Sequence, residues 1–155
     1  MFQGIDQLVI AVPDLEAAHR NFTALGFNVV EGGKHPTGSH NMLVGFADGA
    51  YLELLAFYEE SQDHKWWTKQ EGGLIDYCLQ TNDIEADAAA LRQAGANMGE
   101  VYGLSRLRPD GFKLDWVLVS PGNEQTGLAP FLIRDNTPRE ERVPQQNNHP
   151  NGVAG

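Results

Sequence analysis

The first 30 residues alternate between apolar and polar positions in a pattern that predicts a strand, a helix and a second strand. Residues 5–12 form a mostly apolar run of strand length. Apolar side chains then return at helical spacing and form one stripe, at Leu15, Ala18, Phe22 and Leu25. Asp14 is suited to cap the start of this helix, and Gly26 is suited to end it.

The same pattern returns 69 positions later without a gap, so that Ile5 corresponds to Leu74. IDQLVIAVPDLEAAHRNFTALGFNVVE falls on LIDYCLQTNDIEADAAALRQAGANMGE. The cap residues repeat as well, as Asp83 and Gly95, and Ile84, Ala88 and Leu91 supply the second apolar stripe. The chain therefore contains one unit written twice.

Two more strands are predicted after each strand–helix–strand segment. Residues 40–46 and 51–57 flank Asp48-Gly49, which is typical of a hairpin because glycine adopts the positive φ that such turns need. In the second copy, strands are predicted at residues 113–119 and 129–133. The fold class is therefore α+β, with two βαβββ units.

These elements divide the chain into four stretches that form one structural domain. The first unit spans residues 1–58 and the second spans residues 74–135. Residues 59–73 join them and are predicted to hold a short helix, while residues 136–155 are polar and rich in proline and asparagine. We expect this C-terminal tail to be extended or mobile.

Charge and composition narrow the possible partners. The 155-residue chain has 11 basic and 21 acidic residues, and its formal charge of -10 disfavours nucleic acid and anionic membrane surfaces. Apolar runs are strand-sized, far short of the roughly 20 residues of a membrane span. Cys78 is the only cysteine, so no intrachain disulfide is expected, and the start MFQGIDQ lacks the pattern of a secretion signal. We expect a cytoplasmic protein.

The units and several segments together resemble the glyoxalase-like domain family of the vicinal oxygen chelate (glyoxalase/bleomycin resistance/dioxygenase) superfamily. The segments are IDQLVIAVPDLEAA, HPTGSHNMLVGFADGAYLELLAF, HKWWTKQEGG, SRLRPDGFKLDW and APFLIRD, and the terminal HPNG is similar too. The resemblance covers roughly residues 4–134. It implies that each unit curls into half of a cup, with the helices outside and the site inside, and that the chain forms a homodimer. Family members often continue past HPNG, so the chain is either a short natural version or part of a longer protein.

The resemblance also implies where a metal would be held, on the first and last strands of each unit. Those positions fall on Gln7 and Glu53 in the first unit and on Asp76 in the second, where the last strand offers only Leu132 or Ile133. This set lacks imidazole and has at most three ligands, which is few for a divalent ion. We therefore expect no cofactor and a degenerate, metal-free site, with a divalent metal on Gln7, Glu53 and Asp76 as the alternative.

Other side chains are candidates for lining a ligand pocket. Glu53 and His40 are the candidate catalytic residues, because a carboxylate in an apolar strand and a histidine opening another strand could both move protons. The candidate ligand-binding residues are Gln7, Asn41, Asp76, Trp67, Arg106 and Trp116. The remaining histidines are expected at the surface: His19, His35, His64 and His149.

Three functions remain open, and whether the protein is an enzyme is left undecided. The first is binding, sequestration or metal-independent turnover of a small organic molecule in the cup, as in resistance proteins of this superfamily that sequester drugs. The second is a metal-dependent lyase, isomerase or ring-cleaving dioxygenase that uses Glu53 as a ligand. The third is a non-catalytic interaction domain with a cup filled by its own side chains. The sequence contains no GxSxG, GxGxxG, P-loop, HExxH or CxxC motif.

Overall fold

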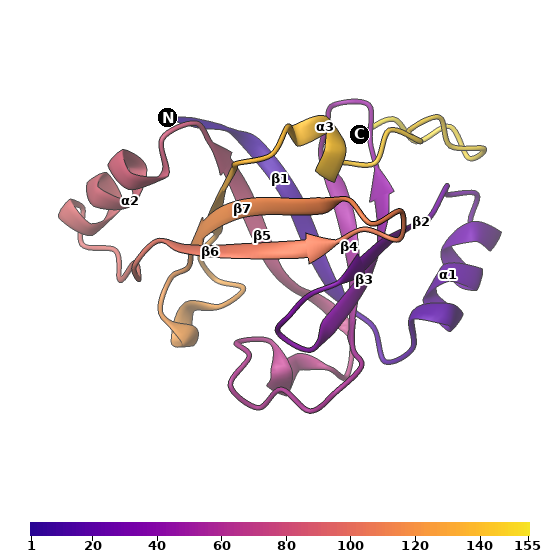
Figure 1. Cartoon of the computed structure of the whole chain (residues 1–155), viewed down its shortest axis with the longest axis horizontal. Helices are drawn as coiled ribbons and strands as arrows, with labels where there is room; N and C mark the ends of the chain where they lie inside the picture. The colour runs from indigo at the N-terminus through magenta and orange to yellow at the C-terminus, as the bar shows by residue number, and fades with distance from the viewer.

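One mixed sheet of eight strands closes into a barrel in the computed structural model, which describes residues 1–155 (Figure 1). The strands follow one another around the barrel in the order β1-β4-β3-β2-β6-β7-β8-β5. Their bounds are β1 Phe2–Ala11, β2 Val30–Lys34, β3 Ser39–Gly45, β4 Tyr51–Phe57, β5 Gly73–Thr81, β6 Tyr102–Leu107, β7 Lys113–Val119 and β8 Phe131–Asp135. The β1–β4 and β5–β8 pairs are parallel and the other pairs are antiparallel. The fold is therefore α+β, with a barrel-like cup at its centre.

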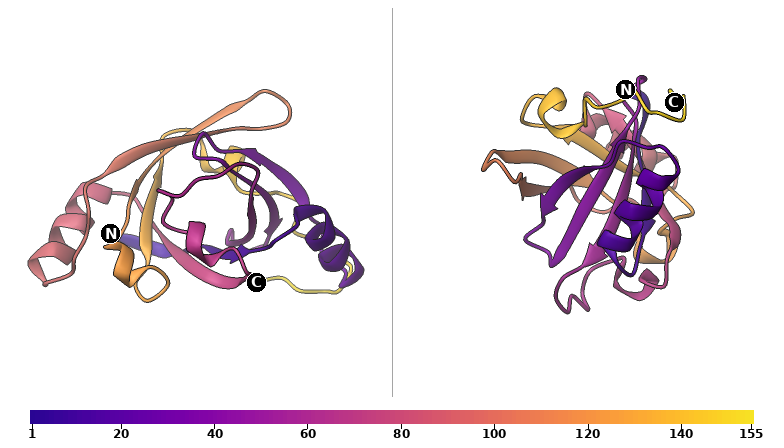
Figure 2. Two further views of the ribbon diagram at one scale, coloured as in Figure 1. Left: turned by 90° about the horizontal axis from the view of Figure 1, so that it is seen from below. Right: turned by 90° about the vertical axis from the view of Figure 1, so that its right-hand side faces the viewer.

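Two helices cover the outside of the barrel at opposite ends of the molecule (Figures 1 and 2). They are α1 Leu15–Ala24 and α2 Ile84–Gln93, and a third, α3, spans Arg139–Arg142. The predicted caps are confirmed: Asp14 accepts hydrogen bonds from two amides of the first turn of α1, and Asp83 accepts one in α2. None of the three helices is long and apolar enough to cross a membrane.

The main core lies inside the barrel, and each long helix packs a smaller core against the outside. Eleven buried side chains form the inner cluster, among them Trp66, Trp116 and Phe131. Leu15 and Ala18 attach α1 to the sheet, and Ile84 and Ala88 attach α2. Leu25 was expected in the first stripe but is 64% exposed, because it lies just beyond the helix.

Residues 136–155 do not form a loose tail, contrary to the expectation from their polar composition. The segment carries α3 and runs along the top of the barrel in Figure 1. Arg142, Val143 and His149 are buried, and His149 contacts the backbone of Gly45 and Asn28. Composition misled here because the segment is fixed mainly by buried ion pairs and polar contacts, to which Val143 adds packing against Leu43 and Tyr51.

The segment between β4 and β5 lies over one end of the barrel (Figure 2). It contains a single 3-10 turn, Trp67–Lys69, where a short helix was predicted. Gly72 and Gly73 follow with positive φ, which lets the chain reverse into β5. Trp66, just before the turn, is buried in the core of the barrel.

Candidate functional site

A cavity of about 50 Å³ lies inside the barrel, between a polar wall and an apolar wall. The polar wall is lined by Gln7, His35, Thr37, Ser39, Asn41, Tyr51, Glu53, His64, Arg106 and Arg142. The apolar wall is lined by Trp66, Leu104, Trp116, Leu118, Phe131 and Ile133. Converging polar groups beside apolar side chains are typical of a small-molecule site, and the small volume restricts a fully enclosed ligand to a few heavy atoms.

Glu53 is the only carboxylate in this lining, and it is only 3% exposed. The amide nitrogen of Gln7 donates to its Oε2 at 2.9 Å, and that of Asn41 donates to its Oε1 at 2.6 Å. Glu53 points into the barrel because side chains alternate between the two faces of a strand. Tyr51, two residues earlier on β4, therefore lies on the same face. The carboxylate therefore has a fixed position, with acceptor capacity left on both oxygens.

A chain of hydrogen bonds reaches Glu53 from Arg142. Arg142 Nη1 donates to the hydroxyl oxygen of Tyr51 at 2.6 Å, and Tyr51 donates to Oε1 of Gln7 at 2.9 Å. A guanidinium can only donate, so the proton of Tyr51 is directed to Gln7. The oxygen of Gln7 is thereby occupied, and its amide nitrogen must face Glu53.

A second chain reaches Glu53 from Arg106. Arg106 Nη1 donates to Oδ1 of Asn41 at 3.0 Å, which leaves the amide nitrogen of Asn41 to face Glu53. Gly32 makes room for this pair, because a Cβ there would lie 2.0 Å from Asn41 Oδ1 and 2.4 Å from Arg106 Nη1. Two arginines are thus linked to one buried carboxylate, each through a side-chain amide. We call the six residues of the two chains the Glu53 network: Arg142, Tyr51, Gln7, Glu53, Asn41 and Arg106.

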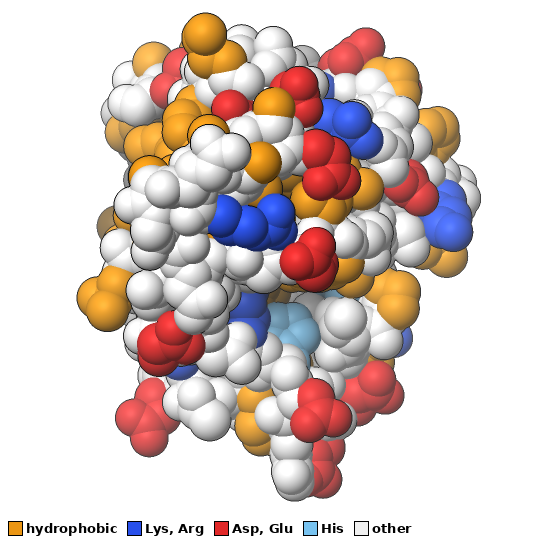
Figure 3. Space-filling view, turned by 90° about the vertical axis from the view of Figure 1, so that its left-hand side faces the viewer, with side chains coloured by type: hydrophobic (Ala, Val, Ile, Leu, Met, Phe, Trp, Pro, Cys, Tyr) orange, Lys and Arg blue, Asp and Glu red, His pale blue; other side chains and the backbone are white.

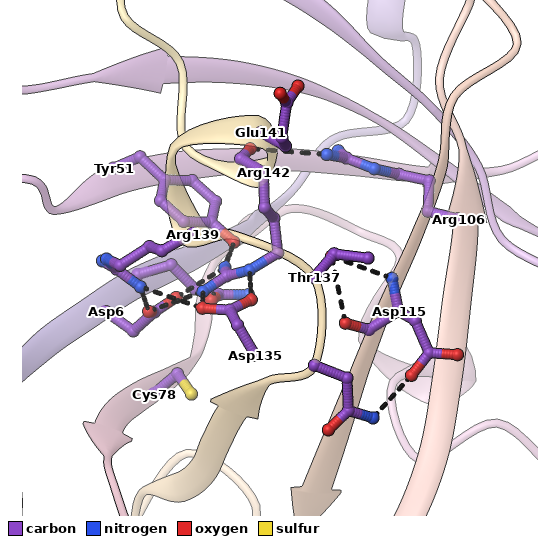
Figure 4. Close-up of polar contacts among 12 residues, drawn as sticks. Asp6, Tyr51, Cys78, Arg106, Asp115, Asp135, Thr137, Arg139, Glu141 and Arg142 are labelled. Carbon is purple, nitrogen blue, oxygen red and sulfur yellow. Dashed lines mark hydrogen bonds and ion pairs between the residues drawn. The ribbon is translucent and has the colours of Figure 1, made fainter.

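The Arg142 end of the Glu53 network is anchored in a buried cluster of charges (Figure 4). Arg142 pairs with Asp6 at 2.8 Å and also with Asp135, while Arg139 contacts both carboxylates. Burial acts to raise the pKa of Asp6, but the attraction of Arg142 and Arg139 outweighs it and holds that pKa below its ordinary value. The C-terminal segment therefore contributes directly to the wall of the cavity.

Two histidines in the lining are uncharged at neutral pH. Burial, with a smaller contribution from the charge of Arg106, lowers the pKa of His35 from 6.5 to about 3. Burial and the charge of Lys65 lower the pKa of His64 to about 4. The prediction of surface positions is wrong for His35 and His149, which are buried, while His64 and His19 are half-buried.

We expect stability to fall as the pH drops below 6.5, because unfolded His35 then binds a proton that the folded protein excludes. With a folded pKa of about 3, the loss from this group is roughly 2 kcal/mol at pH 5. Urea unfolding of the wild type between pH 7 and pH 5 measures it. The slope should flatten in His35→Asn and persist in His19→Asn, and an equal slope in all three would contradict the assignment.

A larger groove of about 550 Å³ leads outward from the cavity. The two spaces share five lining residues: Thr37, His64, Trp66, Leu104 and Leu118. Figure 3 shows a histidine recessed between apolar and charged side chains on the face of the molecule that carries α2. A molecule longer than the cavity could therefore extend into the groove.

The structure brings together five of the residues predicted for the site, and these line the cavity: Gln7, Asn41, Glu53, Arg106 and Trp116. His40 does not join them. It lies on the opposite face of β3 from Asn41 and packs edge-on against Tyr58, with 5.7 Å between ring centroids. Its predicted catalytic role therefore finds no support in its position.

Trp67 and Asp76 also lie outside the cavity lining. Trp67 packs on Phe57 with 5.1 Å between ring centroids, and its neighbour Trp66 takes the predicted place. Asp76 accepts hydrogen bonds from Lys65 Nζ at 3.0 Å and from Trp66 Nε1 at 2.8 Å. The alignment of the two copies placed Asp76 opposite Gln7 but carried no information on these partners.

The lining residues that were missed include Tyr51, His35, His64, Trp66 and Arg142. Tyr51 could have been found, because it lies two residues from Glu53 on the same strand face. The others lie in loops or in the C-terminal segment. Their positions depend on tertiary contacts that no periodicity reveals.

The residues present do not fit the metal site that the resemblance implies. Gln7 and Glu53 are hydrogen-bonded to each other, Asn41 holds the second oxygen of Glu53, and Asp76 is paired with Lys65. The chain contains no group of three or more His, Cys, Asp or Glu side chains that could hold a metal ion. Asp76 lies outside the cavity, so Gln7 and Glu53 alone remain of the predicted set, and these are too few ligands for a divalent ion.

Comparison with known proteins supports both the fold and the family. Residues 5–155 match the family model described as a glyoxalase-like domain. Streptomyces coelicolor methylmalonyl-CoA epimerase, solved with 2-nitronate-propionyl-CoA, is 26% identical with a TM-score of 0.64, covering 88% of this chain and 100% of that chain. Methylmalonyl-CoA epimerase from Mycobacterium tuberculosis is 22% identical with a TM-score of 0.65, covering 92% and 93% of the two chains, and shows the fold alone.

Two further relatives are longer than this chain. A hypothetical protein from Staphylococcus aureus superposes with a TM-score of 0.73 at 21% identity, and the match covers 89% of this chain and 61% of that chain. The teichoic acids export ATP-binding protein TagH of Bacillus anthracis is 28% identical over an alignment of 107 residues that covers 62% of this chain. The match covers 20% of TagH, so the chain spans about a fifth of the length of this curated relative.

Proposed function

Because the chain belongs to the glyoxalase-like domain family, whose model it matches over residues 5–155, we propose that the cavity inside the barrel binds a small organic molecule. Two βαβββ units, residues 1–58 and 74–135, build the cup around it. The observation that carries the proposal is the Glu53 network, which holds a buried carboxylate in a fixed position at the wall of a partly apolar cavity.

The two walls of the cavity suit a ligand with a polar end and an apolar body. Glu53 accepts a hydrogen bond or a proton from the polar end, since each of its oxygens accepts only one bond within the protein. Trp116, Phe131 and Leu118 bury the apolar end. Binding needs no metal, because the amides around Glu53 already orient it.

A second candidate is an isomerase in which Glu53 removes a proton next to a carbonyl group. The likeness to the Streptomyces coelicolor epimerase favours it. Incubating methylmalonyl-CoA with the protein in heavy water tests it, because a proton-transfer enzyme exchanges deuterium into the substrate. That exchange should disappear in Glu53→Gln.

The metal-dependent lyase, isomerase or dioxygenase makes a different prediction. Divalent ions such as manganese, zinc or nickel would raise the melting temperature, and the rise would be lost in Glu53→Ala. Our proposal expects no such rise, because Gln7 and Asn41 would first have to release Glu53. The homodimer stays a prediction that sedimentation can test.

The test of binding is a ligand-observed NMR screen of small molecules against the whole chain. Leu104 lines both the cavity and the outer groove, so Leu104→Trp should fill the entrance and abolish binding. Leu107→Trp is the matched control, because Leu107 lies on the same strand and is 58% exposed. The proposal would be overturned by ligands that bind Leu104→Trp and the control equally tightly. A screen that finds no ligand would overturn it too.

A further inference from the structure

Arg106 is the most unusual charge of the cavity wall, because it is buried without a counterion. It is 3% exposed, and no Asp or Glu oxygen lies within 4.0 Å of its guanidinium nitrogens. Arg142, equally buried, pairs with two carboxylates. A buried charge is normally paired, since removing it from water without a partner is costly.

The guanidinium of Arg106 also has more donors than partners. It carries five N–H groups, of which one reaches Asn41 at 3.0 Å and another reaches the carbonyl oxygen of Arg142 at a long 3.5 Å. Its Nε has no hydrogen-bond partner. The edge formed by Nε and Nη2, which suits a carboxylate in a bidentate arrangement, therefore holds only one weak contact.

The surroundings of Arg106 compensate its charge only in part. Burial lowers its pKa below the ordinary value, although Tyr51 and Glu53 act in the opposite direction, and the neighbouring cations Arg142 and Arg108 add to the lowering. Glu53 contacts Arg106 only through the amide of Asn41. His35 and His64 are neutral, so they add no positive charge that would compete for an anion.

We propose that the cavity takes a small carboxylate anion, toward which Arg106 turns its spare N–H groups, at present buried, while the apolar part of the anion faces Trp116 and Phe131. This inference rests on the proposed function and names the class of ligand for the same site. The apolar wall favours a carboxylate with a hydrocarbon part over inorganic phosphate.

Isothermal titration of the whole chain with paired probes tests the inference. The probes are acetate and propionate, each with its uncharged amide, acetamide and propionamide, and inorganic phosphate. The carboxylates should bind at least about tenfold more tightly than the amides, as expected for charge-assisted hydrogen bonds. Leu104→Trp should abolish this binding, which separates the cavity from the groove that Arg106 borders near α3.

Arg106→Gln should weaken carboxylate binding about tenfold to hundredfold and bring the affinities of each acid and its amide close together. The matched control is Arg108→Gln, since Arg108 lies two residues away, pairs with Asp110 and Glu141, and does not line the cavity. Should Arg106→Gln fail to fold, the NMR signal of the Arg106 Nε–H group in the wild type reports instead. It should shift with propionate and not with propionamide.

The outcomes separate this inference from the proposed function. Equal binding of acids and amides, with no effect of Arg106→Gln, would overturn the carboxylate while the cavity remained a binding site. Binding of phosphate, with no binding of either carboxylate, would also overturn the carboxylate as the class of ligand. Absence of every ligand, here and in the wider screen, would remove the proposed function together with the inference.

Discussion

Arg142→Ala should lower the free energy of unfolding by about 3–5 kcal/mol, the range for breaking a buried ion pair by removing one partner. The guanidinium lies between Asp6 and Asp135, whose side chains are 0% and 9% exposed, so its removal leaves two carboxylates with little access to water. Arg139 remains close to both carboxylates but is itself 24% exposed. Urea denaturation measures the loss.

The control for Arg142 is Arg108→Ala. Arg108 also pairs with two carboxylates, Asp110 and Glu141, but these are 57% and 38% exposed, so its removal should change the free energy of unfolding far less than the removal of Arg142. Adding Asp6→Asn to Arg142→Ala should recover part of the loss, because a neutral amide is less costly to bury than an unpaired carboxylate. Equal effects of the two arginines would contradict the burial of this cluster.

Glu53→Gln should lower the free energy of unfolding by about 2–3 kcal/mol, although the two side chains have nearly the same shape. The new amide nitrogen must face the amide nitrogen of either Gln7 or Asn41, donor against donor. Neither neighbour can turn over, because Tyr51 occupies the oxygen of Gln7 and Arg106 occupies that of Asn41. Chemical denaturation measures the effect.

A second substitution should reverse this conflict. Asn41→Asp alone places two carboxylates side by side and destabilises the protein. Combined with Glu53→Gln, the new carboxylate accepts hydrogen bonds both from the introduced glutamine amide and from Arg106. The double variant should therefore be more stable than either single one, with a coupling energy of about 1–3 kcal/mol. Additive effects would show that the Glu53 network does not have the donor and acceptor directions assigned to it.

The fold was largely predictable from the sequence, because the features that determine it are local and periodic. Asp14 and Asp83 cap the helices as expected, and the predicted strands at residues 51–57 and 113–119 coincide with β4 and β7. The C-terminal segment was not predictable in the same way. Arg142 is held by Asp6, 136 positions earlier in the chain, and no local pattern encodes such a pair.

The candidate site was predictable only where it lies on strands. Gln7 and Glu53, which the resemblance places on the first and last strands of the first unit, line the cavity together with Asn41. His35 and His64 were assigned to the surface because they occur in polar loops, yet both loops fold over the barrel. Asp76 was predicted in the site because the internal repeat aligns it with Gln7. It instead forms an ion pair with Lys65, which lies in a stretch without a counterpart in the repeat.

The central claim is that the cavity beside Glu53 is a ligand site, and a crystal structure of the whole chain with the tightest ligand from the screen tests it most directly. We predict density for that ligand inside the barrel, in contact with Glu53 or Arg106 and against Trp116. Density confined to the outer surface, with the cavity filled by the protein's own side chains, would contradict the claim.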